Sequence, residues 1–248
     1  MREKSCARYH PSTRRVWPWP AVLVEQVADW IGRLPGTKWL DAACGNGQLG
    51  TVLNGRKALV GLDVSAEQLV RVPPGCYGGT VRGSVTSMPV RNASLDGIAS
   101  VETLEHVETV DRAIDEFSRC LRAGGHLIVT VPSVTLRSWW QMKRTGRPVY
   151  CDEREHVREL SSVPLAGFPH KFETWSTFEG RFRRRGFALL RTAGVGFLLP
   201  MWEGRAAAVE HAMNLLYRES ANRWLGRLPI VRRFPYYRLH LFRKGEAA

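Results

Sequence analysis

The sequence has few cysteines, and none of them has the short spacing that builds metal or redox sites. The five are Cys6, Cys44, Cys76, Cys120 and Cys151, and no two form a Cys-x-x-Cys motif. Zinc sites and redox-active dithiols commonly use that spacing. The pattern argues against both kinds of site. It predicts reduced thiols and a cytoplasmic location, with peripheral attachment to a membrane left open.

The sequence also lacks a run of about 20 apolar residues, the length that a membrane-spanning helix needs. The apolar stretch 16–24 follows a basic start as in a leader peptide, but Pro18, Pro20 and the nearby acids Glu25 and Asp29 leave no continuous apolar region. Internal repeats are absent as well. A chain of 248 residues is long enough for one domain with a full core.

Acidic residues are outnumbered by basic ones. The chain has 23 Asp and Glu against 36 Lys and Arg, which gives a formal net charge of +13. This balance favours an anionic partner, whether nucleic acid, anionic lipid or an acidic metabolite. A solvated basic surface explains the same charge, and we expect the basic cluster 181–185 to face solvent.

What the sequence does have is a glycine-rich turn directly after a short apolar run. Residues 39–50 read Trp-Leu-Asp-Ala-Ala-Cys-Gly-Asn-Gly-Gln-Leu-Gly. Such a turn lets a chain leave a parallel strand sharply, approach a ligand closely and enter a helix. The carboxylate of Asp41 would repel a pyrophosphate there and attract a cationic group. We therefore expect a nucleotide-like cofactor beside Gly45 and Gly47.

A second acid, Asp63, ends the next apolar run, 57–63. A carboxylate at this position can accept hydrogen bonds from both hydroxyls of a ribose. The two acids and the turn together indicate a nucleoside that carries an amino-acid tail, namely S-adenosylmethionine. An ordinary Rossmann turn for a nicotinamide cofactor is the alternative.

The pattern Asp41-x-x-Cys44-Gly45-x-Gly47, with Asp63, resembles the first two motifs of class I S-adenosylmethionine-dependent methyltransferases, of the type 11 and ubiquinone-biosynthesis O-methyltransferase kind. The resemblance implies such an enzyme and places its cofactor against Asp41, Ala43, Gly45, Gly47, Asp63, Val64, Ser84, Val85 and Glu102. Ser84 departs from the family, where many members have an Asp that receives the adenine amino group. A hydroxyl or the neighbouring backbone can serve instead.

Apolar periodicity predicts an α/β fold, because strands alternate with helices from 37 to 132. We expect strands at 37–43, 57–63, 79–83, 94–101, 126–131 and 187–193, and helices at 21–34, 48–54, 66–71, 111–121 and 176–185. Gly124 and Gly125 should end the fourth helix, and Ser176 with Glu179 should form a capping box. Residues 236–243 resemble the family's seventh, antiparallel edge strand. The predicted fold is a Rossmann-like, seven-stranded, mostly parallel sheet with helices on both faces.

We expect a single domain over residues 1–248. Its core comprises 21–132, 171–193 and 236–243, preceded by a flexible arm, 1–15. Two insertions, 133–170 and 194–235, lie on the substrate side. The second alternates apolar and basic residues, which is typical of a lid over an acceptor pocket or of an amphipathic segment on an anionic membrane.

Glu102, Glu105 and His106 follow the predicted strand 94–101, at its cofactor end. Three interpretations stay open: His106 is a general base that Glu105 or Glu102 orients, the three side chains ligate a divalent metal, or they support the fold. The spacing resembles metal-dependent O-methyltransferases of ubiquinone biosynthesis and of small-RNA 3′-terminal 2′-O-methylation. In the RNA enzymes a further His precedes a Phe-Glu-Trp-like run, which makes His170 a candidate fourth ligand.

The catalytic candidates are therefore His106, Glu105 and His170. We do not favour a metal, because the same Leu-Glu-His-Val run is widespread in methyltransferases that need none, and methyl transfer depends chiefly on alignment. The leading hypothesis is an S-adenosylmethionine-dependent enzyme that methylates an oxygen of a small hydrophobic or lipid-like metabolite. The alternatives are an RNA 2′-O-methyltransferase with a metal at Glu102, Glu105 and His106, and a non-catalytic cofactor-fold binding protein.

Overall fold

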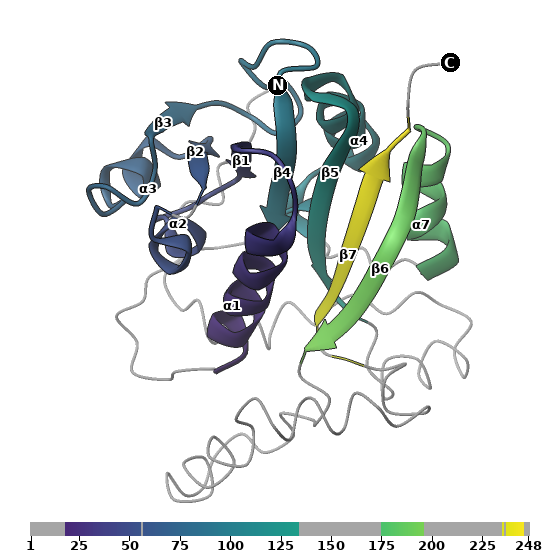
Figure 1. Ribbon diagram of the computed structural model, residues 1–248, viewed down its shortest axis with the longest axis horizontal. Helices are drawn as coiled ribbons and strands as arrows, with labels where there is room; N and C mark the ends of the chain where they lie inside the picture. The colour runs from purple at the N-terminus through teal and green to yellow at the C-terminus, as the bar shows by residue number, and fades with distance from the viewer. Residues whose placement is uncertain (1–17, 56, 134–174, 196–234, 236, 246–248) are drawn as a thin grey trace, which may run out of the picture.

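The computed structural model describes residues 18–55, 57–133, 175–195, 235 and 237–245 (Figure 1). The predicted arm, His170 and most of both predicted insertions lie outside these residues. The described part contains one seven-stranded sheet, with strand order β3-β2-β1-β4-β5-β7-β6. Its strands are β1 (Lys38–Ala42), β2 (Ala58–Asp63), β3 (Gly79–Arg82), β4 (Leu95–Val101), β5 (Leu121–Pro132), β6 (Phe187–Val195) and β7 (Tyr237–Lys244). The helices are α1 (Pro18–Arg33), α2 (Gln48–Leu53), α3 (Ala66–Val70), the 3-10 turn η1 (Leu104–His106), α4 (Val110–Cys120) and α7 (Trp175–Arg183).

The predicted α/β class is confirmed, and the antiparallel strand sits one place further in than expected. β7 runs antiparallel to both β5 and β6 and lies between them. The outermost strand on that side is therefore β6, and β3 is outermost on the other. The prediction of an antiparallel strand from residues 236–243 is right, and its placement at the edge is wrong.

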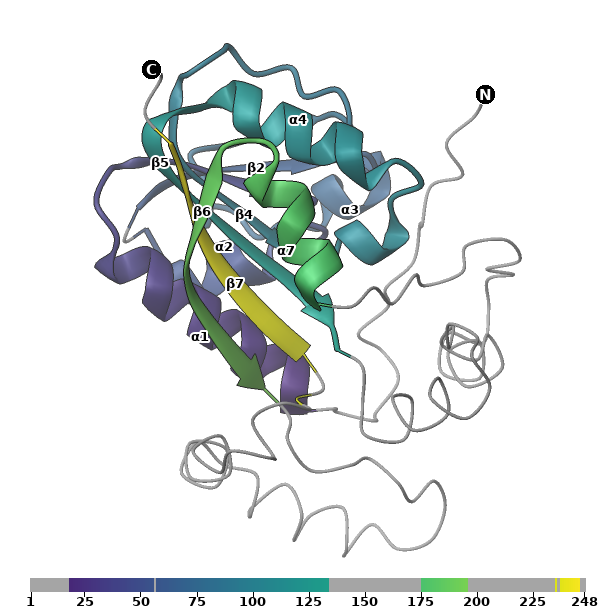
Figure 2. The same cartoon turned by 90° about the vertical axis from the view of Figure 1, so that its right-hand side faces the viewer.

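Helices cover both faces of the sheet, as Figures 1 and 2 show from two directions. On one face, α1 and α2 bury an apolar cluster against β1, β2 and β4, which includes Leu23, Ile31, Trp39 and Leu53. On the other face, α4 and α7 bury a second cluster, which includes Ile114, Phe117, Phe182 and Phe242. The central strands are buried on both sides, which is why their sequences read as continuous apolar runs rather than alternating ones.

Three local predictions fail for physical reasons. Helix α4 ends at Cys120 without a glycine cap, because Leu121 already pairs with Leu95 of β4 and the two glycines lie inside β5 beside a bulge. Helix α7 already begins at Trp175, so Ser176 lies within the helix and is not its N-cap. Arg181 and Arg185 form ion pairs with Asp111 and Asp115 of α4 instead of simply facing solvent.

The parallel strands bring the predicted site residues to one edge of the sheet. In the register, Asp41 of β1 stands opposite both Gly61 of β2 and Ala99 of β4, and Val101 of β4 stands opposite Thr130 of β5. The carboxyl ends of β1, β2 and β4 therefore lie side by side, where open α/β sheets bind their ligands.

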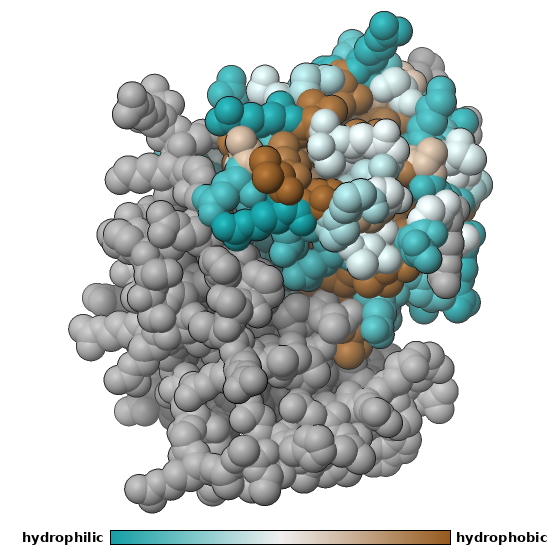
Figure 3. Space-filling view, turned by 90° about the vertical axis from the view of Figure 1, so that its left-hand side faces the viewer, coloured by the Kyte–Doolittle hydropathy of each residue, from teal (hydrophilic) through white to brown (hydrophobic). Residues whose placement is uncertain are grey.

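The surface beside β3 is mixed in character. Seen from that side, apolar and hydrophilic side chains are interspersed over the described residues (Figure 3). All four residues of β3 are exposed, and Val64, Val70 and Val81 are exposed apolar side chains of this region. Among the described helices, none is both long and apolar enough to cross a membrane.

Candidate cofactor and active site

The glycine turn leaves β1 at Ala42 and enters α2 at Gln48. Gly45 and Gly47 have φ values of +53° and +89°, a region that glycine adopts without steric cost. Ala43 also has a positive φ, +68°, although it carries a β-carbon. The backbone N–H groups of Ala43 and Cys44 both donate to the carbonyl oxygen of Leu62, at 2.7 and 2.9 Å. The turn is thus tied to the end of β2.

The side chain of Asp63 fixes the glycine turn through two hydrogen bonds. One carboxylate oxygen accepts a hydrogen bond from the Gly45 N–H at 2.8 Å, and the other accepts one from the Ser65 N–H at 2.8 Å. A carboxylate oxygen can accept more than one hydrogen bond, so these contacts leave room for the ribose hydroxyls that the sequence predicts. Asp63 therefore shapes the turn as well as offering an acceptor beside it.

Asp41 has a partner that the sequence analysis did not identify. Its carboxylate is only 2% exposed, and the Tyr77 hydroxyl donates to its Oδ2 at 2.6 Å. The pKa of Asp41 is raised to about 7. Burial is the largest cause, the hydrogen bond from Tyr77 lowers the pKa in part, and the charge of Asp63 raises it. Asp41 points into the layer under the turn instead of projecting openly into the site.

Glu102 follows β4 in a strained backbone conformation, with a φ of +49° that residues other than glycine seldom adopt. Its N–H donates to the Thr130 hydroxyl oxygen at 2.9 Å, and that hydroxyl donates to the Glu102 carboxyl Oε1 at 2.9 Å. Thr130 of β5 is thus a second supporting residue that sequence reasoning missed. Backbone strain at the carboxyl end of a strand, where such sheets bind their ligands, is typical of functional sites.

Glu102 and Glu105 form a buried carboxyl pair. The Glu105 side chain is 6% exposed. Burial raises the pKa of both groups, and for Glu102 the charge of Glu105 raises it further. Both side chains therefore ionise at higher pH than ordinary carboxyl groups do.

His106 lies beside this pair. Its Nε2 is 3.9 Å from Oε1 of Glu105, which is an electrostatic contact and too long for a hydrogen bond. The imidazole is 33% exposed, whereas Glu105 is buried. His106 is therefore the member of the predicted trio that a bound molecule reaches most easily.

Comparison with known proteins agrees with this geometry. A family model described as a methyltransferase domain matches residues 40–129, which run from β1 through the glycine turn, Asp63 and η1 to β5. Over residues 40–129 the chain therefore matches a methyltransferase domain, and its fold is that of S-adenosylmethionine-dependent methyltransferases.

Relatives of the methyltransferase domain act on different acceptors. The tRNA (carboxymethyluridine(34)-5-O)-methyltransferase ALKBH8 of Mus musculus is 31% identical over 127 residues, 49% of this chain and 18% of that protein. The 2-phytyl-1,4-naphtoquinone methyltransferase of a Synechocystis strain is 29% identical over 118 residues, 43% of this chain and 48% of that enzyme. The chain therefore spans less than half the length of either relative.

The fold of the methyltransferase domain is also that of solved structures. A S-adenosylmethionine-dependent methyltransferase of Thermotoga maritima superposes with a TM-score of 0.59 at 16% identity, covering 92% of this chain and 90% of that one. At this identity the likeness concerns the fold.

The remaining predicted cofactor residues of the methyltransferase domain lie after β2 and β3. Val64 is 40% exposed directly after Asp63, whereas Val85 is packed in the core. The Ser84 hydroxyl lies 2.8 Å from the Thr86 hydroxyl and accepts a hydrogen bond from the Thr86 N–H. Ser84 therefore shapes its own turn, and any adenine contact through its side chain shares that hydroxyl.

A metal centre is not assembled by the residues that the structure describes. Within them, no group of three or more His, Cys, Asp and Glu side chains is arranged to hold an ion. The side chain of Glu102 is hydrogen-bonded to Thr130, and the charge of Glu105 acts on Glu102. The donor set of Glu102, Glu105 and His106 does not fit a metal in this conformation. His170 lies outside the described residues.

Proposed function

We propose that this chain transfers the methyl group of S-adenosylmethionine to an oxygen atom of a small hydrophobic acceptor. The observation that carries the proposal is the placement of a partly exposed imidazole, His106, beside a buried carboxyl pair at the carboxyl end of β4. A hydroxyl acceptor must lose its proton as it is methylated, and an imidazole near neutrality is suited to take it.

Each cofactor contact has a residue that fits it. Asp63 offers oxygens to the ribose hydroxyls, and Val64 offers exposed apolar surface after β2 for the adenine. The backbone of the turn at Gly45 and Gly47 allows close approach, because no β-carbon stands in the way. The negative charge of Asp41 favours the cationic amino end of the cofactor. When bound, S-adenosylmethionine supplies an activated methyl group on a sulfonium centre.

The described residues then account for the handling of the proton. His106 accepts the acceptor's hydroxyl proton on its imidazole, which becomes positively charged. Glu105, whose Oε1 is 3.9 Å from His106 Nε2, stabilises that imidazolium, because a positive charge beside it favours its ionised form. Thr130 keeps Glu102 in place by two hydrogen bonds. Alignment of the hydroxyl with the methyl group supplies the rest of the rate enhancement.

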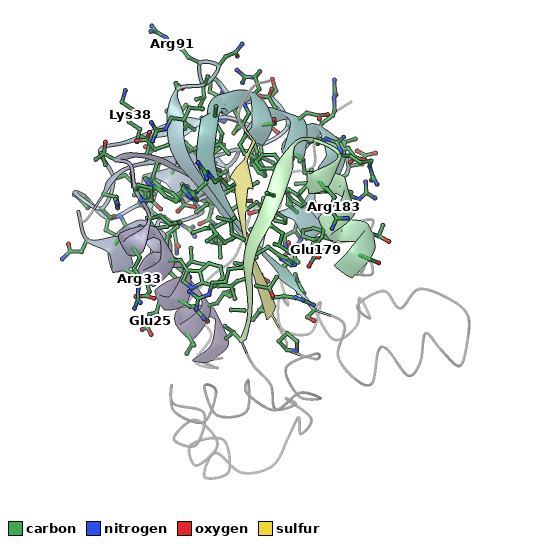
Figure 4. All side chains as sticks on the ribbon, turned by 45° about the vertical axis from the view of Figure 1, so that its right-hand side comes forward. Glu25, Arg33, Lys38, Arg91, Glu179 and Arg183 are labelled. Atoms are coloured by element: carbon green, nitrogen blue, oxygen red, sulfur yellow. The ribbon has the colours of Figure 1, made fainter. Side chains whose placement is uncertain are left out.

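A small hydrophobic acceptor is supported by the Synechocystis relative, whose name specifies a phytyl naphthoquinone. RNA is the second candidate, supported by the tRNA methyltransferase relative and by the net charge of +13. In the described core, Lys38 and Arg91 lie at the end of the sheet opposite the carboxyl edge (Figure 4), whereas Arg82 and Arg238 stand at that edge, opposite Asp63 and Val131. The distribution of basic side chains therefore does not decide between the two candidates, and the experiment below does.

The test is incubation with methyl-labelled S-adenosylmethionine and a cell extract that has been separated into organic-soluble, protein and RNA fractions. We expect label in the organic-soluble fraction, with the methyl group on oxygen by mass spectrometry. Label in RNA would favour the second candidate. Binding of S-adenosylmethionine without transfer to any fraction would favour a non-catalytic binding protein.

Variants then test the assigned roles. His106→Ala should lower kcat by at least about a hundredfold, as loss of a general base does. Glu105→Gln should lower it less, and the matched control Glu108→Gln, three residues away and exposed, should leave it unchanged. Turnover should persist in excess chelator. Loss of activity in chelator that added Mg²⁺ restores would contradict the metal-free mechanism.

A further inference from the structure

We propose that Tyr77 is a positioning residue of the cofactor site, which fixes the Asp41 carboxylate and joins it to the first turn of α2. The inference rests on the proposed function, since it assumes that S-adenosylmethionine binds over the glycine turn. Tyr77 belongs to the loop between α3 and β3, and it lies far in sequence from the motif that it contacts.

The Tyr77 hydroxyl connects two elements of the site. It donates to Asp41 Oδ2 on β1 at 2.6 Å and accepts a hydrogen bond from the Gly50 N–H in α2 at 3.3 Å. Gly50 is in the first turn of α2, where backbone N–H groups have no partner within the helix. The N-cap residue, Gly47, has no side chain to cap the helix. The hydroxyl thus satisfies one free N–H and one buried carboxylate at once.

The ring of Tyr77 packs into a slot whose walls are three glycines. A β-carbon built on Gly47, Gly50 or Gly61 would lie 3.2, 2.6 or 3.3 Å from ring atoms of Tyr77. These glycines come from the turn, from α2 and from β2. A slot assembled from three separate elements holds the ring in one orientation, and the hydroxyl is aimed at Asp41 by that packing.

The ionisation of the Asp41 carboxyl group is favoured by the Tyr77 hydroxyl. The groups that face it are Asp63 at the end of β2, the Cys44 thiol in the turn and Tyr77. Asp63 is a like charge, and burial keeps the Cys44 thiol protonated by raising its pKa. Of the influences on Asp41, the hydrogen bond from Tyr77 is the one that lowers its pKa. Removal of the hydroxyl should therefore leave Asp41 protonated to a higher pH.

The consequence reaches the cofactor through electrostatics. S-Adenosylmethionine binds with its amino group protonated, so its affinity rises with pH as Asp41 ionises. It falls again as the amino group loses its proton near about pH 8. Without the Tyr77 hydroxyl, the rising limb moves to higher pH and overlaps the falling limb. The affinity maximum should then be both lower and displaced to higher pH.

The test is calorimetric titration with S-adenosylmethionine at pH values from 6 to 9. It compares the natural protein with Tyr77→Phe, Asp41→Asn and the double variant. Phenylalanine keeps the ring in its slot and removes only the hydroxyl. We expect Tyr77→Phe to weaken binding by about tenfold at pH 7, the scale of a hydrogen bond to a charged group, with the rising limb at higher pH. Asp41→Asn should abolish the rising limb, and adding Tyr77→Phe to it should change affinity less than twofold, roughly within the additivity error.

A control and three outcomes complete the design. Cys76→Ala, next to Tyr77 in the same loop, should bind like the natural protein. If Tyr77→Phe keeps the natural affinity and pH profile, the inference is wrong. An equal loss at every pH, present also in the Asp41→Asn background, would mean that Tyr77 only supports the fold and would overturn the role through Asp41. If the natural protein binds no S-adenosylmethionine, the proposed function fails first and the inference with it.

Discussion

The ring of Tyr77 occupies the space where a side chain on Gly50 would begin: a β-carbon at Gly50 would stand 2.6 Å from Cζ of Tyr77. Real β-carbons do not approach another heavy atom so closely, and the opposing atom belongs to a rigid ring. The last glycine of the Gly-x-Gly-x-x-Gly turn is therefore required by a tyrosine from another part of the chain. The backbone conformation at this position does not require a glycine, since the φ of Gly50 is not positive.

This relationship predicts opposite effects for two helical glycine-to-alanine substitutions. Gly50→Ala should lower the free energy of unfolding by about 1–3 kcal/mol, because the added methyl group overpacks the slot. Gly32→Ala is the matched control in α1, where a β-carbon would meet no atom within 4 Å. It should raise stability by about 0.5–1 kcal/mol through helix propensity. Urea unfolding of both variants measures the difference, and a Gly50→Ala variant as stable as the natural protein would contradict the packing argument.

Replacement of Asp63 by asparagine should damage both the turn and the cofactor site. An amide presents an NH2 group to one of the two backbone N–H donors, so either Gly45 or Ser65 loses its acceptor. We expect a loss of about 1–3 kcal/mol in stability, as for a buried unsatisfied donor, and at least about tenfold weaker binding of S-adenosylmethionine. Thermal unfolding and calorimetry measure the two effects. Asp29→Asn, which breaks only an exposed ion pair with Arg33, should change neither.

The Glu102–Glu105 pair predicts how the stability of the cofactor-free protein depends on pH. The pKa of Glu105 is raised by burial to about 8, above its ordinary value. Between about pH 4.5 and 8 the folded state therefore holds more protons at this site than the unfolded state does, so the pair's contribution to stability falls as pH rises. Glu105→Gln removes this titration. Between pH 5 and pH 8 the variant should therefore lose less stability than the natural protein does, by about 1 kcal/mol, which corresponds to a few degrees in melting temperature.

Melting temperatures of the natural protein and Glu105→Gln, measured from pH 5 to pH 8, test this expectation. The exposed Glu108→Gln should show the natural slope. A Glu105→Gln variant with an unchanged slope would show that Glu105 does not titrate in this range.

The aromatic packing between α7 and the sheet predicts a large effect on stability. Phe182 is fully buried and stacks on Phe242 of β7, with ring centroids 4.4 Å apart. Phe182→Ala should lower the free energy of unfolding by about 3–5 kcal/mol, because it leaves a cavity between α7 and β7. Leu190→Ala, at a β6 side chain that is 52% exposed, should change it by less than about 0.5 kcal/mol. Denaturant unfolding separates the two, and similar midpoints would contradict the assigned core.

The motif residues could be predicted because their relationships are local. Asp41, Gly45 and Gly47 are a few positions apart, and the backbone geometry of a strand, a turn and a helix follows from that spacing. Tyr77 could not be found in the same way, since its bond to Asp41 spans 36 residues and its loop has no periodicity. The clustered glycines at 47, 50 and 61 were a signal of close packing, but they do not say which side chain fills the space.

The failures in the second half of the fold have the same origin. Glycines after a helix ordinarily end it, but Leu121 pairs with Leu95, and tertiary pairing overrides the local cap. Arg181 and Arg185 were expected in solvent because α4, which supplies Asp111 and Asp115, is 70 residues away in sequence. The position of β7 between β5 and β6 follows from pairing along whole strands, which short sequence patterns do not encode.

The insertion of β7 between β5 and β6 has a consequence for the order in which the protein is assembled. In the described sheet, β6 has no neighbour other than β7, so it cannot join the sheet until β7 has been synthesised. At about 5–20 residues per second, the ribosome takes a few seconds to proceed from β6 to β7. During that time β7 is missing, so the edge of β5 is unpaired and the aromatic face of α7 is uncovered.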